Sequence, residues 1–245
     1  MTNEANTPKR PVPIVLFTRL LVVAWTAVIF LSVVWDYRES KASMLENGRI
    51  WARTHFEKDV LYRLWNASAG GVYLPVSDKT PPNPYLSHLP ERDLTTPSGR
   101  VLTLINPAYM TRQVHELARE KFQVRGHITS LNPIRPENFP DAWETAALQA
   151  FGKGTTEVSS VEKLDGQPFL RLMRPLVTEK SCLACHGKQG YKLGDIRGGI
   201  SIAVPIGPLW SVASANLMSH FISTLSSGSW GPRGFLSGPD NCAGA

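Results

Sequence analysis

The chain has 245 residues, of which 42% are hydrophobic and 19% are charged, and its formal net charge is +6 at pH 7. The positive charges are dispersed along the chain, so they give no case for a nucleic-acid-binding protein. There is no internal repeat, and neither a phosphate-binding loop nor a kinase motif occurs, so we do not expect this chain alone to be an enzyme.

A polar N-terminus at residues 1–11 precedes an apolar stretch at 12–35, in which Arg19 is the single charge. About 20 apolar residues suffice to cross a bilayer, and Arg19 lies near one end. No small-x-small cleavage site follows, so we expect a retained signal anchor, with a cleaved signal peptide as the alternative. Lys9, Arg10 and Arg19 place the N-terminus in the cytoplasm by the positive-inside rule. The predicted location is therefore the inner (cytoplasmic) membrane, crossed once, with the remainder of the chain in the periplasm or its extracytoplasmic equivalent.

Residues 36–67 carry apolar side chains at three-to-four spacing, which predicts an amphipathic helix leading out of the membrane. Gly70 and Gly71 are expected to end this helix, because glycine readily adopts the left-handed cap conformation. A proline-rich stretch at residues 75–99 then predicts an ordered, extended loop.

Short strands and helices are expected after this loop. Asn106 is a typical helix cap, and Pro107 suits the first helical position. The dipeptide Asp165-Gly166 indicates a hairpin. The expected elements are strands at 100–105 and 126–131, helices at 106–122 and up to about 152, and extended runs at 155–164, 168–177 and 198–206.

The last two extended runs flank the motif Cys182-x-x-Cys185-His186. This spacing is typical of c-type haem attachment, in which both sulfurs add to haem vinyl groups and the histidine is the proximal iron ligand. We therefore predict one covalently attached haem c. Haem of this type is attached outside the cytoplasm, which agrees with the predicted topology.

Three other interpretations of the two cysteines are weaker. A thioredoxin-like redox motif needs a βαβ context that these flanks lack. A structural zinc site needs four ligands, commonly two such pairs, whereas Cys242 stands alone. An ordinary disulfide, or two unrelated thiols, is the plain alternative.

The order of elements predicts an α+β domain over residues 36–220. It would contain a small antiparallel sheet with helices to one side, and the haem loop would be inserted between two adjacent strands. This is the layout of a PAS-like sensor domain.

Six blocks of the sequence carry a resemblance to a known family. They read "GGVYLPV", "TPPNPYL", "LTLINPAYMTRQVHEL", "GHITSLNPIRPEN", "DAWE" and "CLACHGKQGYKLGDIRGGISIAVPI". Together they resemble the extracytoplasmic c-haem domains with a PAS-like fold that occur in bacterial membrane-bound sensors. The resemblance implies a signal-input role, with a second membrane helix and a transmitter after the domain.

The C-terminal tail at residues 221–245 departs from that pattern. It is rich in glycine, serine and proline and holds no apolar run long enough to span a membrane. We expect that the reading frame or gene is broken near Ser223, that the transmitter is missing, and that Cys242 is incidental.

The second axial ligand of the iron separates sensing from electron transfer, because a tight ligand favours electron transfer and a displaceable one permits sensing. His127 and Met110 are ranked first, although a histidine opening a strand is more often a surface or core residue. The remaining candidates are His88, His115 and Met173.

Haem propionates need cationic partners, and Arg197 is the preferred one because it directly follows the haem segment. Arg135, Arg174 and Lys188 are further candidates. For each, an exposed and solvated cation is the plain alternative.

Three functions remain. The first is a sensory module whose haem reports redox state or a small ligand. Its expected partners are a diatomic gas or a redox partner and the membrane, and a homodimer is possible. The second is a membrane-anchored monohaem electron carrier. The third, a haem enzyme such as a peroxidase, would need a distal histidine and arginine that the sequence does not place.

Overall fold

The computed structural model describes residues 13–211, apart from the side chains of residues 184 and 185. The chain divides into two units, of which Ser43–Trp210 is the globular one. The expected N-terminal residues 1–11 and the tail at 221–245, with Cys242, lie outside the described residues.

The first element is one helix, α1 (Ile14–Ser68), of 55 residues. Its N-terminal part exposes apolar side chains such as Leu20 and Phe30, and among the described residues α1 has the length and composition needed to cross a membrane. The helix ends as expected, because Gly70 and Gly71 both have positive φ, at 76° and 101°.

A four-stranded antiparallel sheet forms the centre of the globular unit. Its strands are β4 (Arg125–Thr129), β5 (Val158–Leu164), β6 (Gln167–Val177) and β7 (Ile196–Pro205), in the order β4-β7-β6-β5. The predicted hairpin joins β5 to β6: Leu164 pairs with Gln167, and Asp165 and Gly166 have φ of 50° and 77°. Two positive φ values identify the tight primed turn that matches the twist of such strands.

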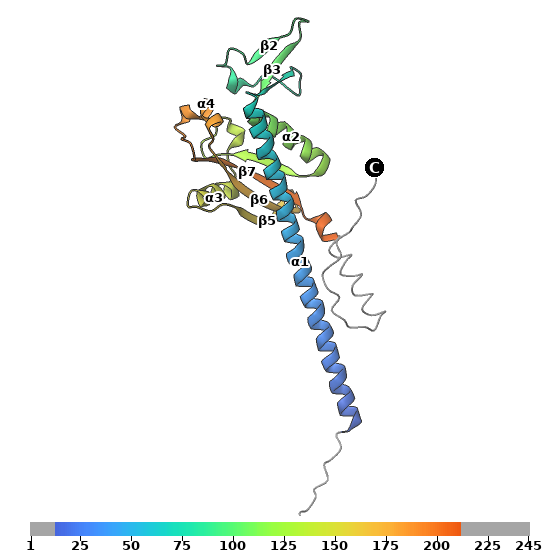
Figure 1. Ribbon diagram of the computed structural model, residues 1–245. Helices are drawn as coiled ribbons and strands as arrows, with labels where there is room; N and C mark the ends of the chain where they lie inside the picture. The colour runs from blue at the N-terminus through green and yellow to red at the C-terminus, as the bar shows by residue number, and fades with distance from the viewer. Residues whose placement is uncertain (1–12, 212–245) are drawn as a thin grey trace, which may run out of the picture. The chain divides into compact units, whose positions relative to one another are not determined.

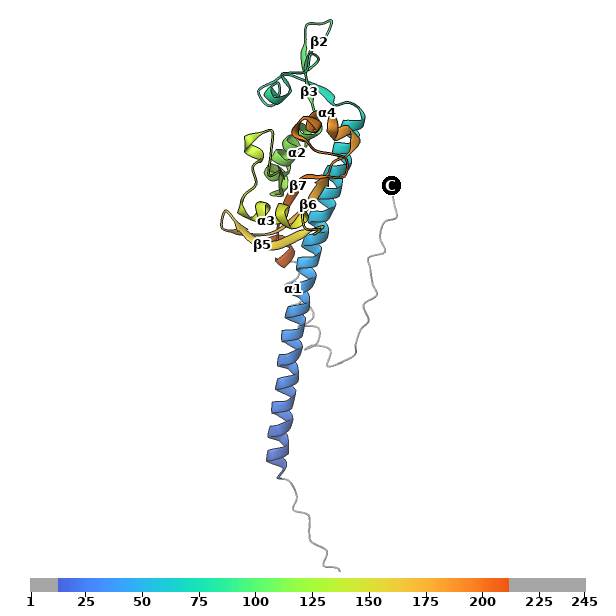
Figure 2. The same ribbon diagram turned by 90° about the vertical axis from the view of Figure 1, so that its left-hand side faces the viewer.

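A second, three-stranded antiparallel sheet is formed by β1 (Val72–Pro75), β2 (Asp93–Thr95) and β3 (Val101–Ile105), in the order β1-β3-β2. The prediction of a single sheet and of a continuous loop at 75–99 was wrong here. The prolines lie mostly between β1 and β2, where one short 3₁₀ turn, Pro84–Leu86, also forms. Both views place this sheet at one end of the globular unit (Figures 1 and 2).

Two helices accompany the sheets. The side chain of Asn106 accepts a hydrogen bond from the Tyr109 N–H (2.9 Å) and caps α2 (Pro107–Phe122), as predicted. A reciprocal capping box between Asp141 and Glu144 begins α3 (Ala142–Phe151). This pairing satisfies amide groups that would otherwise lack partners.

One part of the core lies between α3 and the inner strands of the larger sheet. Ala147, Leu148 and Phe151 of α3 pack with Met173 of β6, which is fully buried. Met173 is therefore a packing residue and not a ligand. The larger of these side chains, those of Leu148, Phe151 and Met173, each contribute about 1.5–3 kcal/mol by leaving water. The result is the expected α+β, PAS-like architecture. The helices do not all lie to one side as expected, because α1 packs on the opposite face of the sheet, where Gly48 meets Leu170.

Candidate functional site

The motif segment is the connection between the paired strands β6 and β7. It contains a 3₁₀ turn (Lys180–Cys182), the one-turn helix α4 (Leu183–His186) and a second 3₁₀ turn (Gly187–Gln189). At its base Thr178 N–H donates to Asp195 O (2.8 Å), and Gly194 N–H donates to Thr178 O (3.0 Å). These two hydrogen bonds close the base of the motif segment and anchor it to β6 and β7.

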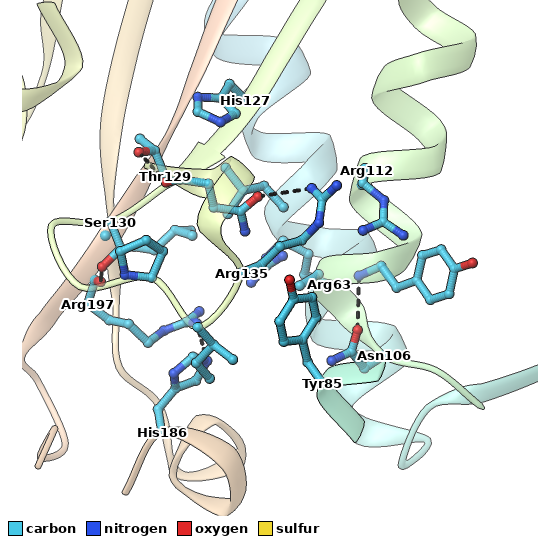
Figure 3. Close-up of a pocket in the computed structure, with 18 of the residues that line it drawn as sticks. Arg63, Tyr85, Asn106, Arg112, His127, Thr129, Ser130, Arg135, His186 and Arg197 are labelled. Atoms are coloured by element: carbon cyan, nitrogen blue, oxygen red, sulfur yellow. Dashed lines mark hydrogen bonds between the residues drawn. The ribbon is translucent and has the colours of Figure 1, made fainter. Parts of the chain in front are cut away.

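His186 is held through both ring nitrogens. Gln189 Oε1 lies 2.5 Å from Nδ1, and Arg197 Nη1 lies 2.7 Å from Nε2 (Figure 3). An amide oxygen only accepts and a guanidinium only donates, so the proton is on Nδ1 and Nε2 presents a lone pair. Burial, and then the charge of Arg197, lowers the pKa of His186 and favours this neutral form. A neutral imidazole with a lone pair on Nε2 is what iron ligation requires, although here that lone pair accepts a hydrogen bond from Arg197, which an iron would have to displace.

Cys182 precedes His186 by four residues, one helical turn, so the two side chains project from neighbouring positions of the segment. Its thiol is half-buried and free, and its sulfur accepts a hydrogen bond from the Glu179 N–H (3.4 Å). The backbone at Cys185 belongs to α4, while its side chain lies outside the described atoms.

His186 faces a cavity of about 590 Å³ within the globular unit. Cofactor-sized ligands occupy pockets of about 300–1,000 Å³. The walls come from α1, the stretch between β1 and β2, α2, β4, the loop after β4, the motif segment and β7. They include Tyr85, Tyr109, Ile128 and Ile134. The cavity therefore offers apolar and aromatic surface beside a nitrogen lone pair.

The charged side chains of this cavity are almost all cationic. Glu116 is the acidic lining residue, and the basic ones are Arg63, Arg112, Arg119, Arg125, Arg135, Lys188 and Arg197. A concave surface with one sign of charge concentrates ligands of the opposite sign. The donor set, the volume and this charge all fit a haem, whose edge carries two propionates.

His127 lines the cavity, but both its ring nitrogens already have acceptors. Nδ1 lies 3.0 Å from each carboxylate oxygen of Glu144, and Nε2 lies 3.2 Å from Glu137 O. Burial alone would lower the pKa of His127, but Glu144 and the Glu137 carbonyl outweigh it, and the net shift is upward. Both ring nitrogens of His127 thus lie against oxygen acceptors, so this arrangement does not favour His127 as an iron ligand, and its first rank stays a prediction.

Met110, the other ligand ranked first, is not among the lining residues. Its sulfur lies 3.8 Å from Asn66 Nδ2 of α1. Met110 and His115 lie on different sides of α2, as expected, and it is His115 that lines the cavity. His115 is buried and its Nε2 lies 2.6 Å from Asp59 Oδ2.

His88 also lines the cavity, from the loop between β1 and β2, and it is exposed. It makes no hydrogen bond to a described residue, in contrast to His115 and His127.

Of the four cations predicted as propionate partners, three line the cavity and one does not. Arg197, Arg135 and Lys188 line the cavity. Arg174 does not: it forms an ion pair with Glu57 and lies over the ring of Phe56. Its place on β6 fitted the sequence criterion, but its side chain serves the contact between β6 and α1.

Sequence reasoning missed Arg63 and Gln189. Arg63 falls on the buried face of α1, at helical spacing from Phe56 and Asp59. A charged residue within an apolar stripe was the available signal. For Gln189 the signal was an amide three residues after the motif histidine.

Fold and site together define a PAS-like domain whose cavity receives a C-x-x-C-H segment. Residues 39–205, more than half of the chain, match the Tll0287-like family, and the chain belongs to that family. The crystal structure of the cyanobacterial haem protein Tll0287 is similar to this chain at 19% identity and a TM-score of 0.42, over 65% of this chain and 94% of that one. No curated protein matches.

Proposed function

We propose that this chain is a membrane-anchored, extracytoplasmic haem-binding input domain that senses redox state or a small ligand. The observation that carries the proposal is the state of His186, which lines a cofactor-sized, cationic cavity as a neutral imidazole whose Nε2 lone pair accepts a hydrogen bond from Arg197. Membership of the Tll0287-like family adds support, because Tll0287 is a haem protein.

The proposed residue roles follow from the site. Cys182 and Cys185 would hold the haem covalently, and His186 would bind its iron. Gln189 donates to Asn132 O (3.1 Å) while its oxygen holds His186 Nδ1, so it fixes the ring orientation and tautomer. The bound haem would supply a one-electron couple and an iron site for small ligands. We propose no catalytic residue and no enzymatic activity.

The anchor gives the proposal its topology. The apolar part of α1 would hold the protein in the inner membrane, with residues 1–11 in the cytoplasm and the globular unit in the periplasm. The helix continues without a break from this part to Ser68, so a displacement at the haem has an element along which to travel. A homodimer would be the natural assembly for such a signal.

The test is an optical spectrum of residues 36–220, exported with haem maturation, in ferric and ferrous forms and then with carbon monoxide. A covalent haem that binds carbon monoxide readily supports a sensor with an open or labile second axial position. A haem that stays six-coordinate and ignores the gas favours a redox switch or a monohaem electron carrier. Absence of covalent haem in the wild-type protein would refute haem attachment.

A further inference from the structure

Arg63 of α1 is an arginine buried without a carboxylate partner. Its side chain lies in the cavity wall, and the residue is 8% exposed. Nη1 donates to Pro107 O (3.3 Å) and Thr111 Oγ1 (3.4 Å), both neutral acceptors. Among the described residues no carboxylate forms an ion pair with Arg63. The nearest candidate in sequence, Asp59, is engaged with His115.

Such a guanidinium is expensive to bury, because a desolvated charge needs a counter-charge. Burial first, and then the charge of Arg197, lowers the pKa of Arg63 to about 10. This value is still far above neutral pH, so Arg63 is charged. Its Nε and Nη2 make no hydrogen bond to a described residue.

Arg197 of β7 adds a second cation to the same wall. Its Nε is buried and has no hydrogen-bond partner, and its Nη1 donates a hydrogen bond to His186 Nε2. Within the described part of the chain Arg197 also lacks a carboxylate partner. A metal that takes the Nε2 lone pair would release Arg197, whose guanidinium would then need a new acceptor in the cavity.

We propose that Arg63 and Arg197 form a two-arginine clamp for one carboxylate, and that this carboxylate is a haem propionate. The inference rests on the proposed function. Two planar guanidinium groups suit a carboxylate, because each presents parallel N–H donors to its oxygens. His186, Arg63 and Arg197 line one cavity, so a single ligand can meet all three (Figure 3). Arg63 then ties the haem edge to α1.

Haem itself is not the only source of a carboxylate or oxyanion, since a small anion from solution has the same chemistry. The location beside the iron-binding nitrogen favours the propionate. The experiment below separates the two sources.

The test compares the haem-loaded wild-type protein with Arg63→Met by spectroelectrochemistry between pH 5 and pH 8. A matched control is Arg112→Met, because Arg112 lines the same cavity but has Glu116 and the Tyr109 ring as partners. Acetate is added to each protein at constant ionic strength as the free-anion probe.

Loss of the Arg63 charge leaves the propionate uncompensated, which favours ferric over ferrous haem. We expect the ferrous-to-ferric ratio at a fixed potential to fall about tenfold, the order expected for one unit charge in a partly buried site. For a one-electron couple this is a midpoint shift of ~59 mV. The propionate would also titrate nearer neutral pH, so the midpoint of Arg63→Met would depend on pH more steeply than that of the wild type.

Two results overturn the clamp. Equal midpoints in Arg63→Met and Arg112→Met, with equal pH dependence, would mean that Arg63 does not meet the propionate. A saturable acetate effect in the wild type that is absent in Arg63→Met would assign the site to a free anion instead. If Arg63→Met does not accumulate with haem, Arg63→Gln removes the charge while it keeps a donor toward Pro107 O, and the same readouts apply. Wild-type protein without covalent haem would instead refute the proposed function.

Discussion

Gln189 Oε1 accepts a hydrogen bond from His186 Nδ1 at 2.5 Å, and this contact decides which ring nitrogen faces the cavity. The same amide donates to Asn132 O, so the motif segment and the loop after β4 are coupled through one side chain. Gln189 is therefore a positioning residue for the proposed iron ligand.

Replacing Gln189 by alanine is expected to leave haem attached and to raise its midpoint potential. The lost acceptor makes the imidazole less basic, and a less basic ligand stabilises ferric iron less. One hydrogen bond of ~1 kcal/mol corresponds to about 40 mV at ~59 mV per tenfold change. Spectroelectrochemical titration measures it, with Gln149→Ala, an exposed glutamine of α3, as the control. A midpoint unchanged from the wild type would remove Gln189 from this role.

The two residues ranked first as second ligands give a contrasting prediction. His127→Phe and Met110→Leu should both retain the wild-type ferric and ferrous spectra, because neither side chain offers a free donor atom to the cavity in this arrangement. The Soret and visible bands report the ligation directly. A change from a six-coordinate to a five-coordinate spectrum in either variant would restore that residue as a ligand.

Glu144 lies at the centre of a buried polar network. It is 1% exposed and contacts His127, Arg171 Nη2 (2.8 Å) and Ser201 Oγ. Removing one charge of such a network leaves the others unpaired, so Glu144→Gln should lower the free energy of unfolding by about 3–5 kcal/mol. Urea denaturation measures the loss, and Glu120→Gln, on the exposed surface of α2, should change little. A loss below ~1 kcal/mol would show that the network is dispensable for stability.

The same network predicts how stability varies with pH. Burial raises the pKa of Glu144, but His127, Ser201 and the Asp141 amide outweigh it and lower it to about 2. The stabilisation from Glu144 is thus present above its unfolded pKa of ~4.3 and is lost as pH falls toward 2. The pKa of His127 is raised, so its contribution is full below ~6.5 and fades as pH rises through the folded value.

Urea midpoints across pH 2.5 to 9 should therefore fall on both sides of a weakly acidic maximum. In Glu144→Gln the acidic decline should be shallower, because the carboxyl that titrates there is gone. An acidic limb of the same steepness in both proteins would contradict the assignment to Glu144.

Gly126 gives a prediction about packing. A Cβ at this position would lie 2.4–2.5 Å from atoms of the His115 ring, which is buried against β4. Gly126→Ala is expected to cost about 1–3 kcal/mol, as overpacking does in well-packed interiors. Thermal unfolding of Gly126→Ala beside Gly207→Ala, where a Cβ meets nothing within 4 Å, isolates the clash. Equal midpoints would mean that the His115 ring moves aside freely.

Local chemistry made much of the fold predictable. Asn106 and Pro107 begin α2, and Asp165-Gly166 turns the β5–β6 hairpin, because each feature depends on neighbouring backbone atoms alone. β1 and β2 escaped prediction since they are short and stabilised by pairing with β3 across the proline-rich stretch.

The motif Cys182-x-x-Cys185-His186 was recognisable in the same local way as a candidate haem site, whereas the surroundings of the candidate second ligands were not. His127 looked available until its position opposite Glu144 and Glu137 was known, and that position depends on how β4 meets α3 and the following turn. Arg63 shows the same limit, because its lack of a carboxylate partner is a property of the packed molecule. Sequence identifies donor atoms, but only packing decides which of them are free.

The closed base of the motif segment has a consequence for how this domain is assembled. Val177 pairs with Ile196 where β6 and β7 begin to separate, and the Thr178–Asp195 hydrogen bond seals that point. The sheet can thus form before the motif segment between these residues holds any cofactor. Excising residues 179–194 and joining the strands with a tight turn should leave a globular unit that folds without a cofactor. Polypeptide folding and the proposed haem ligation would then be separable stages of maturation.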